Sequence, residues 1–363
     1  MPRRDNWGKR KNDKMNVVDA KFEAQKLAFS PIYFQTAVAL IELGILDYIY
    51  KNRRGVKIAD IAKATDISEY GIKVLLEAAQ NIDLVEYLAP DTVKLSKLGF
   101  FVLHDEMTKV NINFVNDVCY SGAKSLVESI KNGKPEGLKV FGDWMTVYEG
   151  LSQLPEKVKK SWFEFDHYYS DVAFPFALEI VWEEKPKYIF DIGGNTGKWA
   201  MACCNYDAAV KVKILDLPGQ LNVARKNVVE NKLDDRIDFH KINLLDASQE
   251  IPKGADAIWM SQFLDCFSEE EIVIILKNVC QASDENTCIY IMETFIDNQD
   301  FPAAQHCLTG TSLYFTTIAN GNSKMYSTSA MYKLVKASGL EVVKEFPLIG
   351  DNFHTILKCK RNS

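Results

Sequence analysis

The sequence predicts an α/β protein: a seven-strand, doubly wound, mostly parallel sheet closed by an antiparallel hairpin, preceded by a mainly helical domain. Three observations predict this fold class. After Lys187, short apolar runs alternate with helical patterns, as in repeated βαβ units. A glycine-rich turn follows the first run. The last two runs are too close together for a parallel crossover between them.

The N-terminal half predicts a winged helix-turn-helix. The stretch 31–49 is apolar on all sides, as a helix buried between partners is. Two short helical patterns follow, and Ser68 is expected to cap the second. The alternating runs LVEYL and TVKLS then flank Pro90-Asp91, a turn signal, and predict a small β-wing.

Charge argues against nucleic acid as the partner of this domain. The helix that would read DNA, SEYGIKVLLEAAQNI, carries one Lys and two Glu, and the whole chain has a net charge of −6. Binding to phosphates needs clustered positive charge. The apolar stretch 31–49 instead favours a homodimer through the N-terminal domain. A winged-helix transcriptional regulator is the alternative.

The expected domain boundaries follow these patterns. Residues 1–20 are expected to form a disordered leader and 21–105 the winged-helix-like dimerisation domain. A helical, aromatic-rich connector over 106–178 is expected to line a substrate pocket, with Phe163, His167 and Tyr168 as candidate wall residues. Residues 179–363 form the Rossmann-like domain.

Cysteine and histidine spacing predicts neither a metal site nor disulfides. The eight cysteines are scattered without a CxxC pair, and the five histidines show no ligand spacing. A reducing cytoplasm fits this usage. The opening 15 residues are basic but lack the apolar core of a signal peptide, and no run reaches the length of a membrane span.

The parallel strands are expected at YIFDI (188–192), VKILDL (212–217), IDFHKIN (237–243), AIWMSQF (257–263) and CIYIMETFI (288–296). Helical patterns lie between them. The final runs, EVVKEFPLI (341–349) and HTILKCK (354–360), are separated only by residues 350–353. A parallel crossover needs a dozen residues or more, so these two strands must form an antiparallel hairpin.

The glycine-rich turn after the first strand is a candidate ligand site. In FDIGGNTGKW, Gly193, Gly194 and Gly197 let the backbone approach a ligand just before a helix N-terminus. Asp191 can accept from a cationic ammonium group. The spacing is D-x-G-G-x-x-G, which differs from the dinucleotide pattern G-x-G-x-x-G. Asp216 closes the second strand, where a carboxylate can bind both hydroxyls of an adenosine ribose.

These motifs carry a family resemblance. DIGGNTG, LDLPG, MSQFLDCFSEEE, METF and the closing hairpin resemble the S-adenosylmethionine-dependent small-molecule O-methyltransferases of plants and bacteria, over about residues 25 to 360. The N-terminal half resembles the dimerisation domain of that family. The resemblance implies S-adenosylmethionine as cofactor. The implied lining adds Leu217, Asn243, Leu244 and Ser261 to the aspartates and glycines above.

The catalytic positions depart from the family pattern. Where relatives have a His-Asp-Trp run whose His is the general base, this chain has Asp265, Cys266 and Phe267. Of two flanking Glu residues, Glu293 is retained and Met325 replaces the other. An aspartate of ordinary pKa, about 3.9, is a weaker base than a His near 6.5, although burial can raise the pKa of a carboxylate by several units.

Several roles for Asp265 therefore remain open. It can serve as the base if it is desolvated, stabilise a cationic sulfonium, orient a substrate hydroxyl, or simply cap the following helix. A substrate methylated at an activated carbon or a nitrogen would need little deprotonation at oxygen. Cys266 is expected to be a packed thiol.

The function expected from the sequence is S-adenosylmethionine-dependent methyl transfer to a small, aromatic, hydroxylated substrate. Asp265 and Glu293 are the catalytic candidates. O-methylation is favoured, with C- or N-methylation as variants. A non-catalytic member that keeps the cofactor as a structural ligand is the other alternative.

Overall fold

The structure is a computed structural model that describes residues 15–350 and 354–362. The chain divides into two compact units, one ending at Asp117 and the other beginning at Val118. This boundary falls inside the stretch 106–178 expected as a connector. Most of the leader expected over 1–20 lies outside the described residues. Helix α1, however, already begins at Val17, because the Asn16 side chain accepts a hydrogen bond from the Asp19 N–H and caps it.

The N-terminal unit has the expected winged-helix elements. Ser68 caps the second helix of the pair by accepting from the Gly71 N–H at 3.2 Å, and β1, β3 and β2 form a small antiparallel sheet in that order. Its elements are α1 (Val17–Glu42), α2 (Ile45–Lys51), β1 (Val56–Lys57), α3 (Ile58–Thr65), α4 (Glu69–Asn81), β2 (Val85–Ala89), β3 (Thr92–Leu95), α5 (Lys97–His104) and α6 (Glu106–Phe114).

The apolar stretch 31–49 is not the single helix that the sequence predicts. It breaks at Gly44, whose φ of +69° is left-handed and ends the helical path between α1 and α2. Several of its large side chains, including Leu40, Ile45 and Leu46, are buried within their own unit. Taken together, the bent pair α1 and α2 has the length and apolar composition of a membrane span, whereas no single helix among the described residues does.

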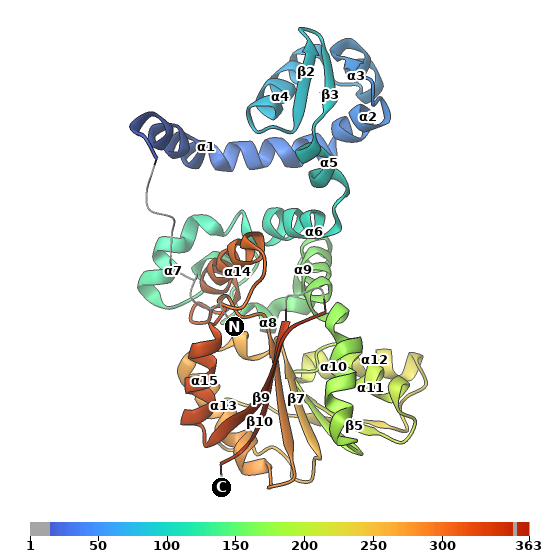
Figure 1. Ribbon diagram of the computed structural model, residues 1–363, viewed down its shortest axis with the longest axis vertical. Helices are drawn as coiled ribbons and strands as arrows, with labels where there is room; N and C mark the ends of the chain where they lie inside the picture. Colours follow the sequence, from blue (N-terminus) through green and yellow to red (C-terminus); the bar gives the residue numbers. More distant parts are fainter. Residues whose placement is uncertain (1–14, 351–353, 363) are drawn as a thin grey trace. The chain divides into compact units, whose positions relative to one another are not determined.

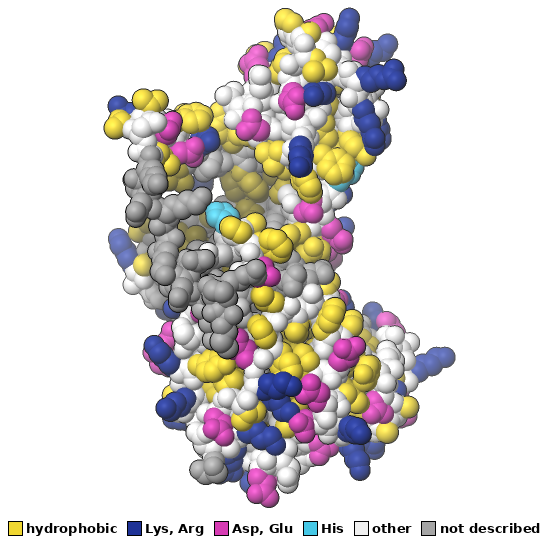
Figure 2. All heavy atoms as spheres, viewed as in Figure 1, with side chains coloured by type: hydrophobic (Ala, Val, Ile, Leu, Met, Phe, Trp, Pro, Cys, Tyr) yellow, Lys and Arg dark blue, Asp and Glu magenta, His cyan; other side chains and the backbone are white. Residues whose placement is uncertain are grey.

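The exposed apolar surface of α1 lies in its N-terminal half instead. Val18, Phe22 and Phe29 follow a helical spacing on one face and are 75%, 60% and 52% exposed. Figure 2 shows apolar side chains gathered at the N-terminal end of this helix. Most of the exposed apolar side chains of α1 thus lie within residues 17–32 rather than in the stretch 31–49.

The second unit contains the predicted seven-stranded sheet, in the order β6-β5-β4-β7-β8-β10-β9. The first five of these strands are mutually parallel, and β10 pairs antiparallel with both β8 and β9. The hairpin prediction is therefore confirmed. The strands are β4 (Tyr188–Ile192), β5 (Lys211–Asp216), β6 (Ile237–Lys241), β7 (Ala257–Ser261), β8 (Cys288–Glu293), β9 (Leu340–Ile349) and β10 (His354–Arg361).

Helices cover both faces of this sheet (Figure 1), α13 and α15 on one face and α10 to α12 on the other. The helices of the unit are α7 (Leu126–Asn132), α8 (Val147–Gly150), α9 (Glu156–Ser170), α10 (Phe174–Val181), α11 (Lys198–Tyr206), α12 (Pro218–Glu230), α13 (Glu269–Ala282), α14 (Pro302–Tyr314) and α15 (Thr328–Ala337). The carboxyl ends of β5, β4, β7 and β8 meet at one edge, and most of the predicted site residues follow these strand ends.

Candidate functional site

The glycine-rich turn joins β4 to α11 and can only be built from glycine. Gly193 has a φ of +72°, and its N–H donates to the Leu215 carbonyl oxygen at 2.9 Å. A Cβ atom on Gly193 would overlap the ring of Phe263. A Cβ atom on Gly194 would lie 2.6 Å from the Asp191 carboxylate. The turn thus brings bare backbone next to Asp191 and next to the segment that follows β7.

Asp191 and Asp216 end adjacent strands and differ in their bonding. Asp191 is 2% exposed, its Oδ2 has no hydrogen-bond partner among the described residues, and burial together with Asp216 raises its pKa to about 8. Asp216 accepts from the N–H groups of Asn195 at 2.9 Å and Leu217 at 2.7 Å. Burial raises the pKa of Asp216 to about 6, against the effect of these two donors.

The remaining cofactor candidates lie beside these aspartates along the strand ends. Ser261 ends β7, and its buried Oγ has no hydrogen-bond partner in the described part of the chain. Leu244 packs into the core. Asn243 is exposed, and its Oδ1 accepts from the Leu245 N–H at 3.1 Å, so an adenine amino group would share that oxygen with the backbone.

Asp265 does not cap the helix that follows it. It lies in the short 3-10 turn Leu264–Cys266, whereas Ser268 caps α13 in a reciprocal capping box with Glu271. This result removes one of the roles considered for Asp265. Its carboxylate is 6% exposed, and burial raises its pKa to about 6. The carboxylate accepts from the Cys266 thiol at 3.5 Å, and burial next to Asp265 raises the pKa of that thiol well above its usual value.

The turn that carries Asp265 is held from three other segments. Glu293 Oε1 accepts from the N–H groups of Phe263 at 3.2 Å and Leu264 at 3.0 Å. Asn320 donates to the Cys266 carbonyl oxygen and Tyr326 to the Phe267 carbonyl oxygen, each at 2.6 Å. Such fixed surroundings are what a positioned catalytic group requires.

Glu293 is also a buried acid, and only one of its two carboxyl oxygens is hydrogen-bonded within the described residues. The residue is 2% exposed, and its Oε2 has no hydrogen-bond partner among the residues that the structure describes. Burial and the neighbouring Asp265 raise the pKa of Glu293 well above its usual value. Asp265, in the turn after β7, and Glu293, at the end of the adjacent strand β8, are thus neighbouring buried carboxyl groups.

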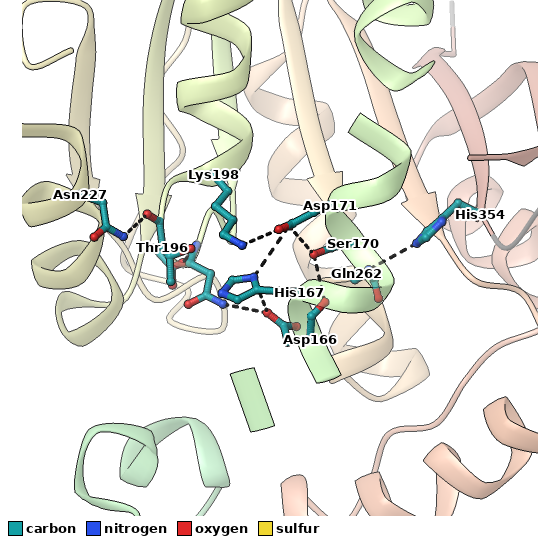
Figure 3. A network of polar contacts seen from close by, with 11 residues as sticks. Asp166, His167, Ser170, Asp171, Thr196, Lys198, Asn227, Gln262 and His354 are labelled. Carbon is teal, nitrogen blue, oxygen red and sulfur yellow. Dashed lines mark hydrogen bonds and ion pairs between the residues drawn. The ribbon is translucent and has the colours of Figure 1, made fainter. Parts of the chain in front are cut away.

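A polar network that the sequence analysis missed connects α9 to the glycine turn (Figure 3). Asp166 accepts from the Asn195 side chain at 3.3 Å, and Lys198, the first residue of α11, pairs with Asp171. Burial and the nearby Asp265 raise the pKa of Asp166 to about 7. The sequence feature that could have identified Lys198 as a site residue is its position directly after Gly197. No motif marks Asp166, because the contact joins segments 29 residues apart.

The three candidate wall residues lie on α9. The Phe163 ring stacks on His167 at a centroid distance of 5.8 Å, and Tyr168 packs edge-on against Tyr169. Burial and Lys198 lower the pKa of His167, so its imidazole is predominantly neutral at pH 7. Behind Phe163, Trp162 donates to the Tyr314 hydroxyl at 2.7 Å, which ties α9 to α14.

The residues present fit S-adenosylmethionine. The unpaired Asp191 oxygen suits an ammonium group, the Asp216 carboxylate suits ribose hydroxyls, and the bare turn admits a ligand without a Cβ atom in its way. No group of three or more His, Cys, Asp or Glu side chains in the described ranges could hold a metal ion.

Comparisons with known proteins identify two protein families along the chain. The model of the O-methyltransferase domain matches residues 124–341, and that of the Dimerisation2-like domain matches residues 21–91. Demethylspheroidene O-methyltransferase of Cereibacter sphaeroides is 22% identical over 316 residues, covering 87% of this chain and 80% of the relative. Bacteriochlorophyllide d C-20 methyltransferase of Chlorobaculum tepidum is 22% identical over 344 residues, covering 90% of this chain and 93% of the relative.

The fold recurs in solved methyltransferases. An O-methyltransferase from neocarzinostatin biosynthesis, solved with S-adenosylmethionine and 2-hydroxy-5-methyl naphthoic acid, superposes with a TM-score of 0.68 at 18% identity. The match covers 92% of this chain and 96% of that one.

Proposed function

The chain belongs to the O-methyltransferase domain family, whose model covers more than half of it, and we propose that it methylates a small aromatic acceptor at a hydroxyl group. It is an S-adenosylmethionine-dependent methyltransferase. The cofactor supplies an electrophilic methyl group on a positively charged sulfur. Everything else that the reaction needs must come from the residues at the carboxyl edge of the sheet.

One half of the site binds the cofactor. Asp191 accepts from its ammonium group and Asp216 from the ribose hydroxyls, while Gly193, Gly194 and Gly197 let the backbone approach. Leu217, Asn243, Leu244 and Ser261 complete this side. The unpaired oxygen of Asp191 and the cradle that a Cβ atom would fill support the assignment.

Asp265 takes the proton from the acceptor hydroxyl. The observation that carries this role is a buried carboxylate, not used as a helix cap, at the position where relatives have their base. With its pKa raised to about 6, the Asp265 carboxylate is still mostly ionised at pH 7 and is a stronger base than an ordinary aspartate. Glu293 positions the turn through its Oε1, which accepts from the N–H groups of Phe263 and Leu264.

The acceptor lies against the aromatic face of α9. Phe163 and the neutral His167 offer parallel ring surfaces that suit a flat aromatic substrate, and Tyr168 extends the wall. The name of the Chlorobaculum tepidum relative specifies carbon as its acceptor atom, so C-methylation is the variant to test against. The regulator alternative is not favoured.

The protein acts as a homodimer in the cytoplasm. The exposed apolar face of α1 supplies a surface for a second copy, and the match to a dimerisation-like domain supports the same conclusion. All eight cysteines are free thiols, which suits a reducing compartment.

The test of this function is transfer of a labelled methyl group. The purified protein is incubated with methyl-labelled S-adenosylmethionine and fractionated small-molecule extracts, and products are detected by mass spectrometry and assigned by NMR. A methoxy product supports the proposal, and a C- or N-methyl product replaces it. Cofactor binding without transfer to any fraction would favour a non-catalytic member.

A further inference from the structure

The carboxyl groups near Asp265 form an acidic set with little neutralisation. Glu293 from β8 and Asp166 from α9 are both buried, and burial together with the neighbouring Asp265 raises the pKa of each carboxyl group. The Lys198 ammonium partly offsets the charge on Asp166, but it is itself paired with Asp171. The acidic set has no metal-binding geometry among the described residues.

The unpaired Oε2 of Glu293 independently points to a ligand. A buried carboxyl oxygen without a partner is costly unless a bound group satisfies it. The other oxygen of Glu293 is already bonded to Phe263 and Leu264, the residues that lead into Asp265. Glu293 at the end of β8 and Asp265 in the turn after β7 are therefore neighbouring buried carboxyl groups, one of which has an oxygen without a partner among the described residues.

The strand order places this surface relative to the cofactor. Asp216 ends β5 on one side of β4, and Asp265 follows β7 on the other side. A ligand held by its ribose at Asp216 and by its ammonium group at Asp191 would extend from the end of β5 across the glycine turn, on whose other side β7 ends. The Phe263 ring at Gly193 brings the Asp265 segment directly beside that turn.

We propose that Asp265 and Glu293 recognise the positive charge on the sulfur of S-adenosylmethionine, so that this site binds the methyl donor more tightly than the demethylated product S-adenosylhomocysteine. The proposal rests on the proposed function and deepens it. The two ligands share their ammonium, carboxylate, ribose and adenine groups, so the contacts of Asp191 and Asp216 contribute similarly to both. The ratio of their affinities isolates the residues around the sulfur.

The expected size of this preference follows from the linkage between proton binding and cation binding at the same site. A positive charge within about 4–6 Å lowers the pKa of a carboxyl group by about 1–3 units, and linkage makes the ionised site bind that cation tighter by the same factor. We therefore expect a preference of about tenfold or more for S-adenosylmethionine at pH 8. The preference should shrink as the pH falls below about 6, where Asp265 becomes protonated.

The ionisable groups around Asp265 are few. Among the described residues, Tyr148 from α8, Tyr326 from the segment before α15, and Cys266 interact with it besides Asp166 and Glu293. Burial raises the pKa of each of these three well above pH 8. The carboxyl groups titrate over the acid range together with His167, which lies beside Asp166 and whose pKa is lowered by burial and Lys198. Binding of the cation near pH 6 should release protons that the product does not release.

The test is titration calorimetry of the full-length protein with three probes: S-adenosylmethionine, S-adenosylhomocysteine and sinefungin, which carries an amino group in place of the sulfonium methyl. The affinity of sinefungin should resemble that of the methyl donor rather than that of the product. Runs at pH 6 in buffers of different ionisation enthalpy count the released protons. Asp265→Asn should bring the affinity ratio of donor to product toward one by weakening only the cationic ligands.

Glu293→Gln keeps the oxygen that accepts from Phe263 and Leu264, and it serves as the second variant if Asp265→Asn does not fold. Glu270→Gln, an exposed acid nearby on α13, is the matched control and should leave the ratio unchanged. Equal affinities for donor and product in the unmodified protein would overturn the proposal, as would a ratio that neither Asp265→Asn nor Glu293→Gln changes. If none of the three probes bound, the proposed function itself would fail.

Discussion

The ring of Phe263 occupies the space that a Cβ atom on Gly193 would need, so the glycine turn and the segment leading to Asp265 are in direct contact. Gly193→Ala must therefore displace that segment, and it also strains a residue whose φ is +72°. A left-handed alanine costs about 1–2 kcal/mol before any overlap is counted. We expect a lower melting temperature and at least tenfold weaker cofactor binding, measured by calorimetry.

Gly219→Ala is the control for that substitution. A Cβ atom there would meet nothing within 4 Å, and the residue lies in α12 without a left-handed φ. Its stability and cofactor affinity should match those of the unmodified protein. Equal behaviour of the two variants would mean that the turn is not part of the binding site.

Asp216→Ala should weaken S-adenosylmethionine binding at least tenfold. A charge-assisted hydrogen bond is worth roughly 1.5–3 kcal/mol, and the change also leaves the N–H groups of Asn195 and Leu217 without their acceptor. Calorimetry measures the affinity, and Asp216→Asn, which keeps one acceptor oxygen, should lose less. Unchanged affinity in the alanine variant, or preferential binding of NAD, would contradict the assignment of the cofactor site.

Phe22→Asp combined with Phe29→Asp should convert the homodimer to a monomer. Both side chains lie on the exposed apolar face of α1, where a charge cannot be buried against a second copy. Light scattering of the full chain gives the mass. Val229→Asp on α12, which is 56% exposed, is the control and should not change it. A monomeric unmodified protein would refute the dimer.

Asp265→His tests the acceptor atom. A neutral imidazole restores the residue that the family resemblance implies at this position and should support methylation of a hydroxyl at an appreciable rate. An enzyme whose acceptor is carbon would not be helped by this change. Initial rates with the acceptor identified from the extracts decide between the two. A rate below that of Asp265→Asn would argue against a proton-transfer role at this position.

The sheet could be predicted from the sequence because buried parallel strands leave continuous apolar runs. The run at 188–192 matches β4 residue for residue, and the four-residue gap at 350–353 forced the hairpin. Gly44 was harder to interpret, because a glycine in an apolar helical pattern is tolerated in many helices. Only packing within the N-terminal unit determines that the chain turns there.

The site was predictable where a motif is local and not where it depends on tertiary contacts. Asp191, the glycines and Asp216 follow strand ends in a recognisable order. Asp265 could be located from the sequence but its role could not, since the competing helix cap was excluded only by the bonds of Ser268. Asp166 was missed because nothing in its neighbourhood along the chain reveals its contact with Asn195.

The most direct test of a carboxylate base is the pH dependence of single-turnover methyl transfer by the unmodified enzyme and by Asp265→Asn. The base must be ionised, and its pKa is raised to about 6, so the unmodified rate should rise with pH through that value and then level off. Asp265→Asn should lack this rise and be about 10²-fold slower, with S-adenosylhomocysteine affinity unchanged. A full rate in Asp265→Asn, with the same pH profile, would contradict the account.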